Sequence, residues 1–481
     1  MSSTGLLLGA GASYDIGMPL AAELTDELRN WLTPAKLRSL NDGWRQQGGG
    51  YSDAAIEGLA DVLVRQDMTY EHILGHLQVE QARANSQEHH GLIAFLSEAL
   101  YALLKERHVL NISFIARAIR NLDGVKRLAE MQRPLWIFSL NHDLLVECFS
   151  AYSGVPLKCG YSEERVRLPR RDAAGSTVGE IEALVMRREQ LLEGRLSFFW
   201  AGTLGINLLK IHGSLDEFAF NDGQDLLKLA PAEGSISATL SVLDLVNKEV
   251  RYVDPRWPGG VVRGSNEIIY EDAEGEMQFL RRSLLGGMFK FQGQQGQTVP
   301  VELLRYFEST LNRLSALICI GYGFGDAHIN QAIREWLERT AERHLTIVDP
   351  ANSGVPVSLL HLSPQVRVEA VTATDYLDRE GNVIRSRQEQ LKEEMSRIIR
   401  ADSARGKMLL AELHERVMAG LMDRAVELFG RLPRKGEEVE LDRLDVSSEA
   451  LADWIREQIQ VPSTEELLED FLEQATDSPA V

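Results

Sequence analysis

The chain contains a small set of side chains that could perform acid–base chemistry at neutral pH. Asn141 and Asp143 come directly after an apolar run at 135–139, and His212 comes directly after another at 208–211. An imidazole titrates near neutral pH and can act as a general base. Asn and Asp at such positions also commonly cap helices, and a single histidine is often structural. Each residue alone therefore has a structural explanation as well as a chemical one.

Glycines at two places could let a phosphate or a sugar approach the backbone closely. The stretch 9–13 (GAGAS) follows the apolar run at 6–8, and the stretch 321–325 (GYGFG) follows the run at 317–320. Pro19 then suits the first turn of a helix. Strand, glycine turn and helix is the arrangement that binds phosphate in nucleotide sites, although a plain turn has the same pattern. The candidate ligand-binding residues are Gly9, Ala10, Gly11, Ser13, Gly321, Tyr322, Gly323, Asp326 and Asp349. Asp326 could cap the next helix or contact a sugar hydroxyl.

Short apolar or β-branched runs recur along the chain and must position these groups. They lie at 6–8, 135–139, 208–211, 317–320, 345–348 and 366–371. Helical patterns lie between them, and this alternation predicts an α/β fold with a Rossmann-like parallel sheet covered on both faces by helices. Ligands of such sheets bind beyond the carboxyl ends of the strands, where the polar residues and glycines fall.

The predicted organisation is one catalytic domain over 1–380 and an α-helical C-terminal domain over 381–481. Residues 33–130 have helical apolar spacing and form a helical insertion. Residues 155–205 form a basic insertion with the segments RVRLPRRD and MRREQ. A solvated loop is the favoured interpretation of this insertion, and a contact for an acidic partner or nucleic acid is the alternative. In the C-terminal part, an apolar stripe predicts a helix whose apolar face either mediates assembly with a second chain or packs within its own small domain; it comprises Leu409, Leu413, Val417 and Leu421.

Composition excludes several classes of protein. The 481 residues carry a formal net charge of −20, which argues against broad nucleic-acid binding because that requires a basic surface. No stretch is long and apolar enough to span a bilayer, and no basic region precedes the first apolar run, as a signal peptide requires. The three cysteines show no paired spacing, so we expect no zinc or other metal site, no disulfide framework, and a cytoplasmic location.

Five motifs occur in the same order as in the sirtuin superfamily, over residues 1–350. Residues 9–13 with 17–19 (GMP) resemble the family's G-A-G-x-S…G-I-P phosphate loop, and 139–143 (SLNHD) resembles its T-Q-N-x-D motif. His212-Gly213 resembles its catalytic H-G pair. Residues 321–323 and 347–349 fall where the family has G-T-S and I-N. The resemblance implies that NAD⁺ is a substrate, with the adenosine ribose near Asp349.

The chain departs from sirtuin deacylases at two places. Residues 20–22 (LAA) replace an acidic residue followed by Phe-Arg, and no cysteine lies between His212 and Cys319, where deacylases carry four zinc cysteines. The stretches 210–216 (KIHGSLD) and 321–330 (GYGFGDAHIN) are more similar to sirtuin-like domains of bacterial anti-phage systems. The resemblance therefore implies an NAD⁺ hydrolase without zinc that depletes NAD⁺ in anti-phage defence by abortive infection.

The resemblance also implies a role for each site residue. The loop at 9–13 binds the pyrophosphate, Asn141 positions the ribose and the water, and His212 is the general base. Asp143 supports the site electrostatically or holds Asn141 in place. Because unrestrained NAD⁺ hydrolysis is toxic, we expect regulation through a homo-oligomer, a HerA-type ATPase partner or a phage-derived activator.

Three other functions remain open from the sequence. The first is an NAD⁺-dependent protein deacylase, which should hold structural zinc. The second is a non-catalytic NAD⁺ or nucleotide sensor, which should bind without turnover. The third is a subunit whose main task is assembly through the helical C-terminus.

Overall fold

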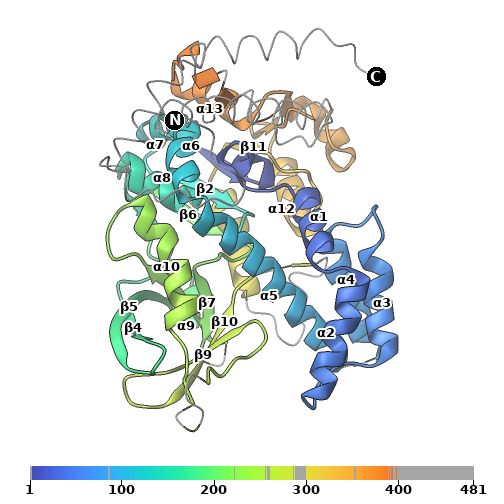
Figure 1. Ribbon diagram of the computed structural model, residues 1–481. Coiled ribbons are helices and arrows are strands. Elements are labelled where there is room, and N and C mark those ends of the chain that lie inside the picture. The colour runs from blue at the N-terminus through green and yellow to red at the C-terminus, as the bar shows by residue number, and fades with distance from the viewer. Residues whose placement is uncertain are drawn as a thin grey trace, which may run out of the picture. The chain divides into compact units, whose positions relative to one another are not determined.

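The described part of the chain is built around two β-sheets with helices packed against them (Figure 1). This computed structural model describes residues 3–397, with gaps at 85–86, 222, 255, 257–259, 285, 288–298, 352–353, 388, 391 and 394–396. Contacts between residues divide the chain into one unit that ends at Val383 and another that begins at Ile384. All elements named here belong to the first unit.

The larger sheet is parallel and has the strand order β13-β12-β11-β1-β2-β6-β3. Its strands are β1 (Thr4–Leu8), β2 (Leu135–Ser139), β3 (Leu157–Lys158), β6 (Ile206–Lys210), β11 (Ala316–Ile320), β12 (His344–Val348) and β13 (Val366–Glu369). All six predicted strands are present in it, so the predicted Rossmann-like α/β fold is confirmed. The two-residue strand β3 is the one member that the sequence pattern did not indicate.

The helices of the first unit fall into two groups along the chain. Those before and directly after β2 are α1 (Ala21–Trp31), α2 (Pro34–Gln46), α3 (Asp53–Leu63), α4 (Tyr70–Ala84), α5 (Gln87–Leu110), α6 (Ile112–Ala118), α7 (Asp123–Met131) and α8 (Leu145–Ser153). The later ones are α9 (Arg188–Leu192), α10 (Ile236–Glu249), α11 (Val301–Leu311), α12 (Ala327–Glu338) and α13 (Ala373–Gly381). Three 3₁₀ helices complete the set: η1 (Ala10–Ile16), η2 (Ile119–Leu122) and η3 (Val357–Gln365). Helices α2 to α7 occupy the region of the predicted helical insertion.

The parallel sheet is buried on both faces, as its uninterrupted apolar strands require. Successive side chains of a strand point to opposite faces. Leu6 accordingly packs in the core cluster that contains residues of α1, α5, α7 and α8, while Leu7 packs in the cluster that contains residues of α11 and α12. Both side chains are fully buried.

The direction of the chain through the parallel sheet reverses at β1. After β1 the chain passes to β2 and then to β6 on one side, and it later crosses to β11 on the other side of β1 and continues outward to β12 and β13. In open α/β sheets, a crevice for ligands forms at such a switch point, beyond the carboxyl ends of the strands. Topology therefore places a binding site where β1 and its neighbours end.

The predicted start of the first helix is wrong by two residues. Residues after β1 form η1, which is followed by Gly17 with a φ of 102°, and α1 begins only at Ala21. Glu23 accepts a hydrogen bond from the backbone N–H of Leu20 at 3.0 Å and so caps the helix. Pro19 consequently lies ahead of the helix and lines the cavity described below.

The smaller sheet is antiparallel and was not predicted from the sequence. Its order is β4-β5-β8-β7-β10-β9, and its strands are β4 (Arg165–Arg171), β5 (Thr177–Met186), β7 (Glu217–Phe220), β8 (Asp225–Ala230), β9 (Glu267–Glu271) and β10 (Met277–Arg282). One face packs on α10 around Phe218, Leu227 and Val246. In chain order, β4 and β5 lie between β3 and β6 of the parallel sheet, and β7 to β10 lie between β6 and β11, so these strands form an inserted layer.

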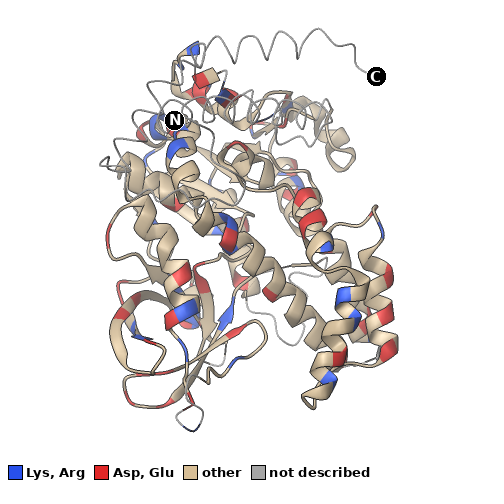
Figure 2. Ribbon diagram, in the orientation of Figure 1, with Lys and Arg blue, Asp and Glu red and all other residues tan. Residues whose placement is uncertain are grey.

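The solvated-loop interpretation of the basic segment is wrong, because RVRLPRR forms strand β4. Its arginines pair with carboxylates of neighbouring elements, at Arg165–Glu182, Arg167–Glu180, Arg170–Glu249 and Arg171–Glu271. Acidic and basic residues are likewise interspersed along the helices (Figure 2). The arginines of β4 thus have acidic partners within the protein, and the alternative of a contact for an acidic partner or nucleic acid stays a prediction.

Two further predictions concern the chain as a whole. Among the described helices, none has the length and apolar character needed to cross a membrane. The apolar stripe from Leu409 to Leu421 lies outside the described residues, as does the predicted C-terminal domain from residue 398 onward. The helical character of that region and its role in assembly remain predictions.

Candidate active site

A cavity of about 320 Å³ opens at the carboxyl ends of β1, β2, β6 and β11. It lies at the switch point of the parallel sheet, and its volume is in the range of small-molecule sites. Most candidate residues from the sequence line it: Gly9, Ala10, Ser13, Asn141, Asp143, His212, Gly321, Tyr322, Gly323 and Asp326. The fold thus brings together groups from four segments that are far apart in the sequence.

The glycines after β1 and β11 allow two loops to interlock. The N–H of Gly11 donates to the carbonyl of Gly321 at 3.0 Å. A Cβ at Gly11 would lie 2.7 Å from Cα of Gly321, and Gly321 itself has a φ of 63°. Gly323 is different, because a Cβ there would meet no atom within 4 Å. Packing between the loops therefore requires glycine at 11 and 321, whereas Gly323 borders open space in the cavity.

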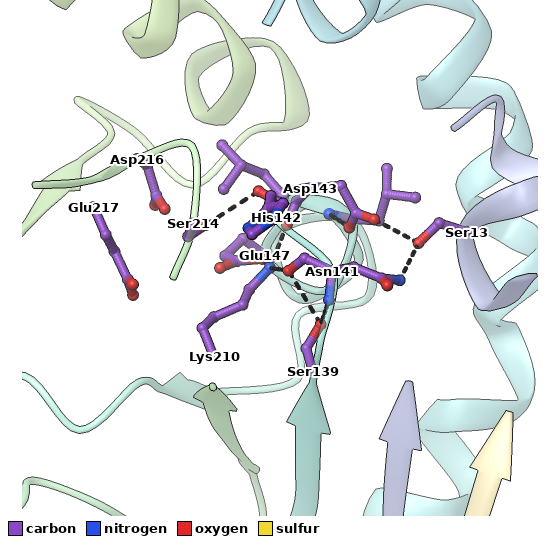
Figure 3. Close-up of polar contacts among 12 residues, drawn as sticks. Ser13, Ser139, Asn141, His142, Asp143, Glu147, Lys210, Ser214, Asp216 and Glu217 are labelled. Carbon is purple, nitrogen blue, oxygen red and sulfur yellow. Dashed lines mark hydrogen bonds and ion pairs between the residues drawn. The ribbon is translucent and has the colours of Figure 1, made fainter. Parts of the chain in front are cut away.

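Asn141 and Asp143 are joined through the hydroxyl of Ser13 (Figure 3). Ser13 Oγ donates to Oδ2 of Asp143 at 2.6 Å and accepts from Nδ2 of Asn141 at 2.9 Å. Nδ2 of Asn141 also donates to the carbonyl of Gly9 at 2.8 Å. Asp143 additionally accepts from the N–H of Leu145 at 3.1 Å, so it caps α8 as well. The carboxamide of Asn141 is therefore fixed by the loop that follows β1.

His212 is paired with a carboxylate from the far side of the switch point. Its Nε2 lies 3.2 Å from Oδ2 of Asp326, and both side chains are almost fully buried. The other oxygen of Asp326 accepts from the N–H groups of His328 and Ile329 at 2.9 and 3.2 Å and caps α12. The sequence offered two roles for Asp326, a helix cap or a contact to a sugar. The structure shows the cap and adds the contact with His212.

The helical insertion supplies a second wall that sequence reasoning missed. Thr69, Glu71 and His72 at the start of α4 line the cavity, as does His142 from the turn after β2. Nδ1 of His72 accepts from the N–H of Thr69 at 3.2 Å, which fixes the first turn of α4. The signal for His142 was its place inside the 139–143 motif, whereas nothing in the sequence near residue 70 pointed to a site.

The cavity is acidic. It is lined by the carboxylates Glu71, Asp143 and Asp326, and no lysine or arginine is among the described residues that line it. An anionic group bound there would depend on backbone N–H groups, while a cationic group would be attracted by the carboxylates. The arrangement therefore suits a ligand that has a positive charge in its reacting part.

A cluster of buried charges lies beneath the turn that carries Asn141 and Asp143. Lys228 Nζ contacts Asp216 at 2.7 Å and Glu147 at 3.0 Å, and Glu147 also lies 3.7 Å from Lys210. Burial alone would raise the pKa of Glu147, but the two ammonium groups outweigh it and hold this pKa below its usual range. Burial raises the pKa of Glu217, 3.7 Å from Lys228, to about 7.

Two candidate residues occupy other positions. Neither Gly11 nor Asp349 is among the described residues that line the cavity. Oδ1 of Asp349 accepts from the N–H of Ala351 at 2.9 Å, which forms the turn that follows β12. In the described part of the chain, no group of three or more His, Cys, Asp or Glu side chains is arranged to hold a metal ion.

Among the comparisons with known proteins, the one with solved structures found similar chains. No protein-family model matches the chain, and no curated protein matches it. Three of the similar solved structures are a Sir2 homologue mutant with ADP-ribose, a Sir2 homologue with NAD and a Sir2 protein with a propionylated peptide. Their TM-scores are 0.36, 0.33 and 0.31, at 12%, 12% and 10% identity, and the matches cover 79% of this chain and 90%, 88% and 94% of the others.

Proposed function

We propose that this chain binds NAD⁺ and hydrolyses the bond between nicotinamide and ribose. The observation that carries the proposal is the group of three polar units around one cavity at the switch point. They are the linked set Asn141–Ser13–Asp143, the pair His212–Asp326, and the close backbone at 9–11 and 321–323. The motifs that resemble the sirtuin superfamily supply these groups in the same order.

The dinucleotide would lie across the carboxyl ends of β1 and β11. Open space next to Gly323 admits the pyrophosphate close to the backbone. The hydroxyl proton of Ser13 is already donated to Asp143, so we assign Ser13 to the ordering of Asn141 rather than to the phosphate. The assignment of Asp349 to a ribose has no support from the cavity lining.

Cleavage breaks the C1′–N bond, and the bonding electrons leave with the nicotinamide, which becomes neutral. The ribosyl group acquires positive charge in the transition state, as in glycoside hydrolysis, and the carboxylate of Asp143 stabilises it. Water then forms a bond to C1′ and gives a proton to His212. Asp326 orients the imidazole and stabilises its protonated form. The products are ADP-ribose, nicotinamide and a proton.

The test is incubation of the purified full-length chain with NAD⁺, with nicotinamide and ADP-ribose measured over time. Release of both products without any acyl peptide supports hydrolysis. Release that depends on an acetylated peptide would instead indicate a deacylase. If calorimetry detects binding of NAD⁺ but no nicotinamide is released, with and without candidate activators, the chain acts as a sensor and the proposal is overturned.

The biological setting is a further part of this proposal. The resemblance to sirtuin-like domains of anti-phage systems supports a role in defence, in which depletion of NAD⁺ stops phage growth. Such an activity needs a trigger, and a homo-oligomer, a HerA-type ATPase or a phage protein could supply it. Light scattering of the full chain, and NAD⁺ turnover with each candidate added, test these three routes.

A further inference from the structure

We propose that Lys210 is a positioning residue, whose ammonium group holds the turn 141–143 in the shape that presents Asn141 and Asp143 to the cavity. This inference rests on the proposed function. Lys210 does not line the cavity, so it acts on the reaction only through the main chain of the turn.

The contacts of Lys210 are to carbonyl groups of that turn. Lys210 is the last residue of β6, and its side chain is 1% exposed. Its Nζ donates to the carbonyl of Asp143 and, at 3.4 Å, to the carbonyl of Asn141 (Figure 3). Two carbonyls that face one ammonium group are held on the same side of the turn. The side chains of Asn141 and Asp143 then meet the hydroxyl of Ser13.

A buried cation is costly unless it is paired, and Glu147 supplies the pairing. Oε2 of Glu147 lies 3.7 Å from Nζ of Lys210, and its other oxygen lies 3.0 Å from Nζ of Lys228. Lys228 in turn contacts Asp216, four residues after His212. The turn after β2 carries Asn141 and Asp143, and the segment after β6 carries His212. Both segments contact the same cluster of charges, so we expect the positions of Asn141 and His212 to depend on it.

The charges of the cluster indicate a variant that tests the positioning role of Lys210 separately from its effect on the stability of the chain. With every group ionised, Lys210 and Lys228 face Glu147, Asp216 and Glu217, which leaves one negative charge in excess. Lys210→Met alone leaves two in excess, and Glu147 keeps only Lys228 as a cationic partner. Lys210→Met with Glu147→Gln restores an excess of one; it removes the contact of Lys210 to the turn and the Lys210–Glu147 ion pair, and it puts a neutral amide in place of the carboxylate beside Lys228.

The experiment compares this double variant with the natural chain by hydrogen–deuterium exchange and by kinetics. We expect the amides of 140–145 to exchange at least about tenfold faster, while exchange in β1 and β11 stays the same. We expect kcat for NAD⁺ cleavage to fall roughly 10- to 100-fold, since small misplacements of catalytic groups have effects of this size. KM should change less than about threefold, because binding through the loops at 9–11 and 321–323 is retained.

A control removes an ion pair elsewhere in the chain, which is partly buried, by the same two kinds of substitution. Arg170→Met with Glu249→Gln takes away a 2.7 Å pair between β4 and α10, away from the cavity lining, and should leave both the exchange of 140–145 and kcat unchanged. Natural exchange at 140–145 in the Lys210 double variant would overturn the proposal, as would natural kcat. The exchange measurement does not require turnover, so a chain that fails to cleave NAD⁺ refutes the proposed function without hiding the result for Lys210.

Discussion

Oγ of Ser13 donates a hydrogen bond to Oδ2 of Asp143 at 2.6 Å, and this bond joins the loop after β1 to the turn after β2. Sequence motifs of this kind are usually assigned one residue at a time. Under the proposed function, Ser13 orders Asn141 and is not assigned to the phosphate, because its hydroxyl proton is donated within the protein. Its effect on any ligand passes through Asn141.

Ser13→Ala should therefore damage catalysis without loss of the fold. The carboxylate of Asp143 loses a donor and the carboxamide of Asn141 keeps only its bond to Gly9, so we expect a loss of about 1–3 kcal/mol in stability and a fall in kcat of roughly 10-fold or more. Nicotinamide release and thermal unfolding measure the two effects. Ser235→Ala is the matched control, because it removes the serine cap of α10 at about 1 kcal/mol and should leave kcat unchanged.

Asn141→Ala and His212→Ala should each abolish NAD⁺ cleavage with the fold intact. Loss of a general base typically lowers the rate about 10²–10⁴-fold, and loss of Asn141 removes the group expected to orient ribose and water. The rate of nicotinamide release and the circular dichroism spectrum measure the outcome. Natural rates in both variants would show that the cavity has another role.

Asp326→Asn should separate the two tasks of Asp326. Asn caps a helix as well as Asp does, so the stability conferred by the bonds to His328 and Ile329 is retained. The charge beside His212 is lost, and we expect kcat to fall roughly 10- to 100-fold. Asp326→Ala should add a loss of about 1 kcal/mol in thermal stability. Equal activity of the Asn variant and the natural chain would rule out a catalytic contribution from the carboxylate.

Gly323→Val should block NAD⁺ binding and leave stability unchanged. A Cβ at position 323 meets no protein atom within 4 Å, so we expect the protein to accommodate the added side chain and a bound ligand to clash with it. We expect affinity to fall by roughly 10-fold or more, which is about 1.4 kcal/mol. Gly11→Val should also block binding, but by clashing with Gly321, and should lower stability by about 1–3 kcal/mol. Calorimetry and thermal melts of both variants distinguish the two causes.

Glu217→Gln should stabilise the protein above neutral pH. The pKa of Glu217 is about 7 in the folded chain, against 4.5 for an ordinary glutamate, so the folded state binds this proton more tightly than the unfolded chain. The resulting stability is fully present below pH 4.5 and is lost as the pH rises through 7, with a total on the order of 3 kcal/mol. The melting temperature of the natural chain should therefore fall, relative to the variant, between pH 5 and pH 8. Parallel curves would contradict this behaviour of Glu217.

Most of the parallel sheet could be predicted because β1, β2, β6 and β11 are short apolar runs that are largely buried. Such runs can be predicted as strands without knowledge of the strands they pair with, and the polar residues that follow them indicate where the site lies. The antiparallel sheet could not be predicted in the same way. In β4, charged side chains alternate with apolar ones, and its arginines are neutralised by residues that are distant in the sequence, such as Glu249 and Glu271.

The wall formed by α4 was missed for a related reason. Thr69 directly precedes α4 and His72 lies in its first turn; the apolar pattern of this helix indicates only burial, and the approach of both residues to the cavity depends on how the helical insertion packs. For Asp326, only one of its two contacts could be predicted from the sequence. The sequence correctly suggested a helix cap, but the contact with His212 joins two crossover connections and has no local signature.

The interlock between Gly11 and Gly321 also sets when a working cavity can exist in a growing chain. β1 pairs with β11, which is made roughly 300 residues later, a delay of roughly 15 to 60 s at ordinary rates of synthesis. Until then the loop at 9–11 lacks its partner, and Asp326 is absent beside His212. A nascent chain, or one ended early by a premature stop codon, therefore has every residue of the Asn141 turn and still lacks an assembled site.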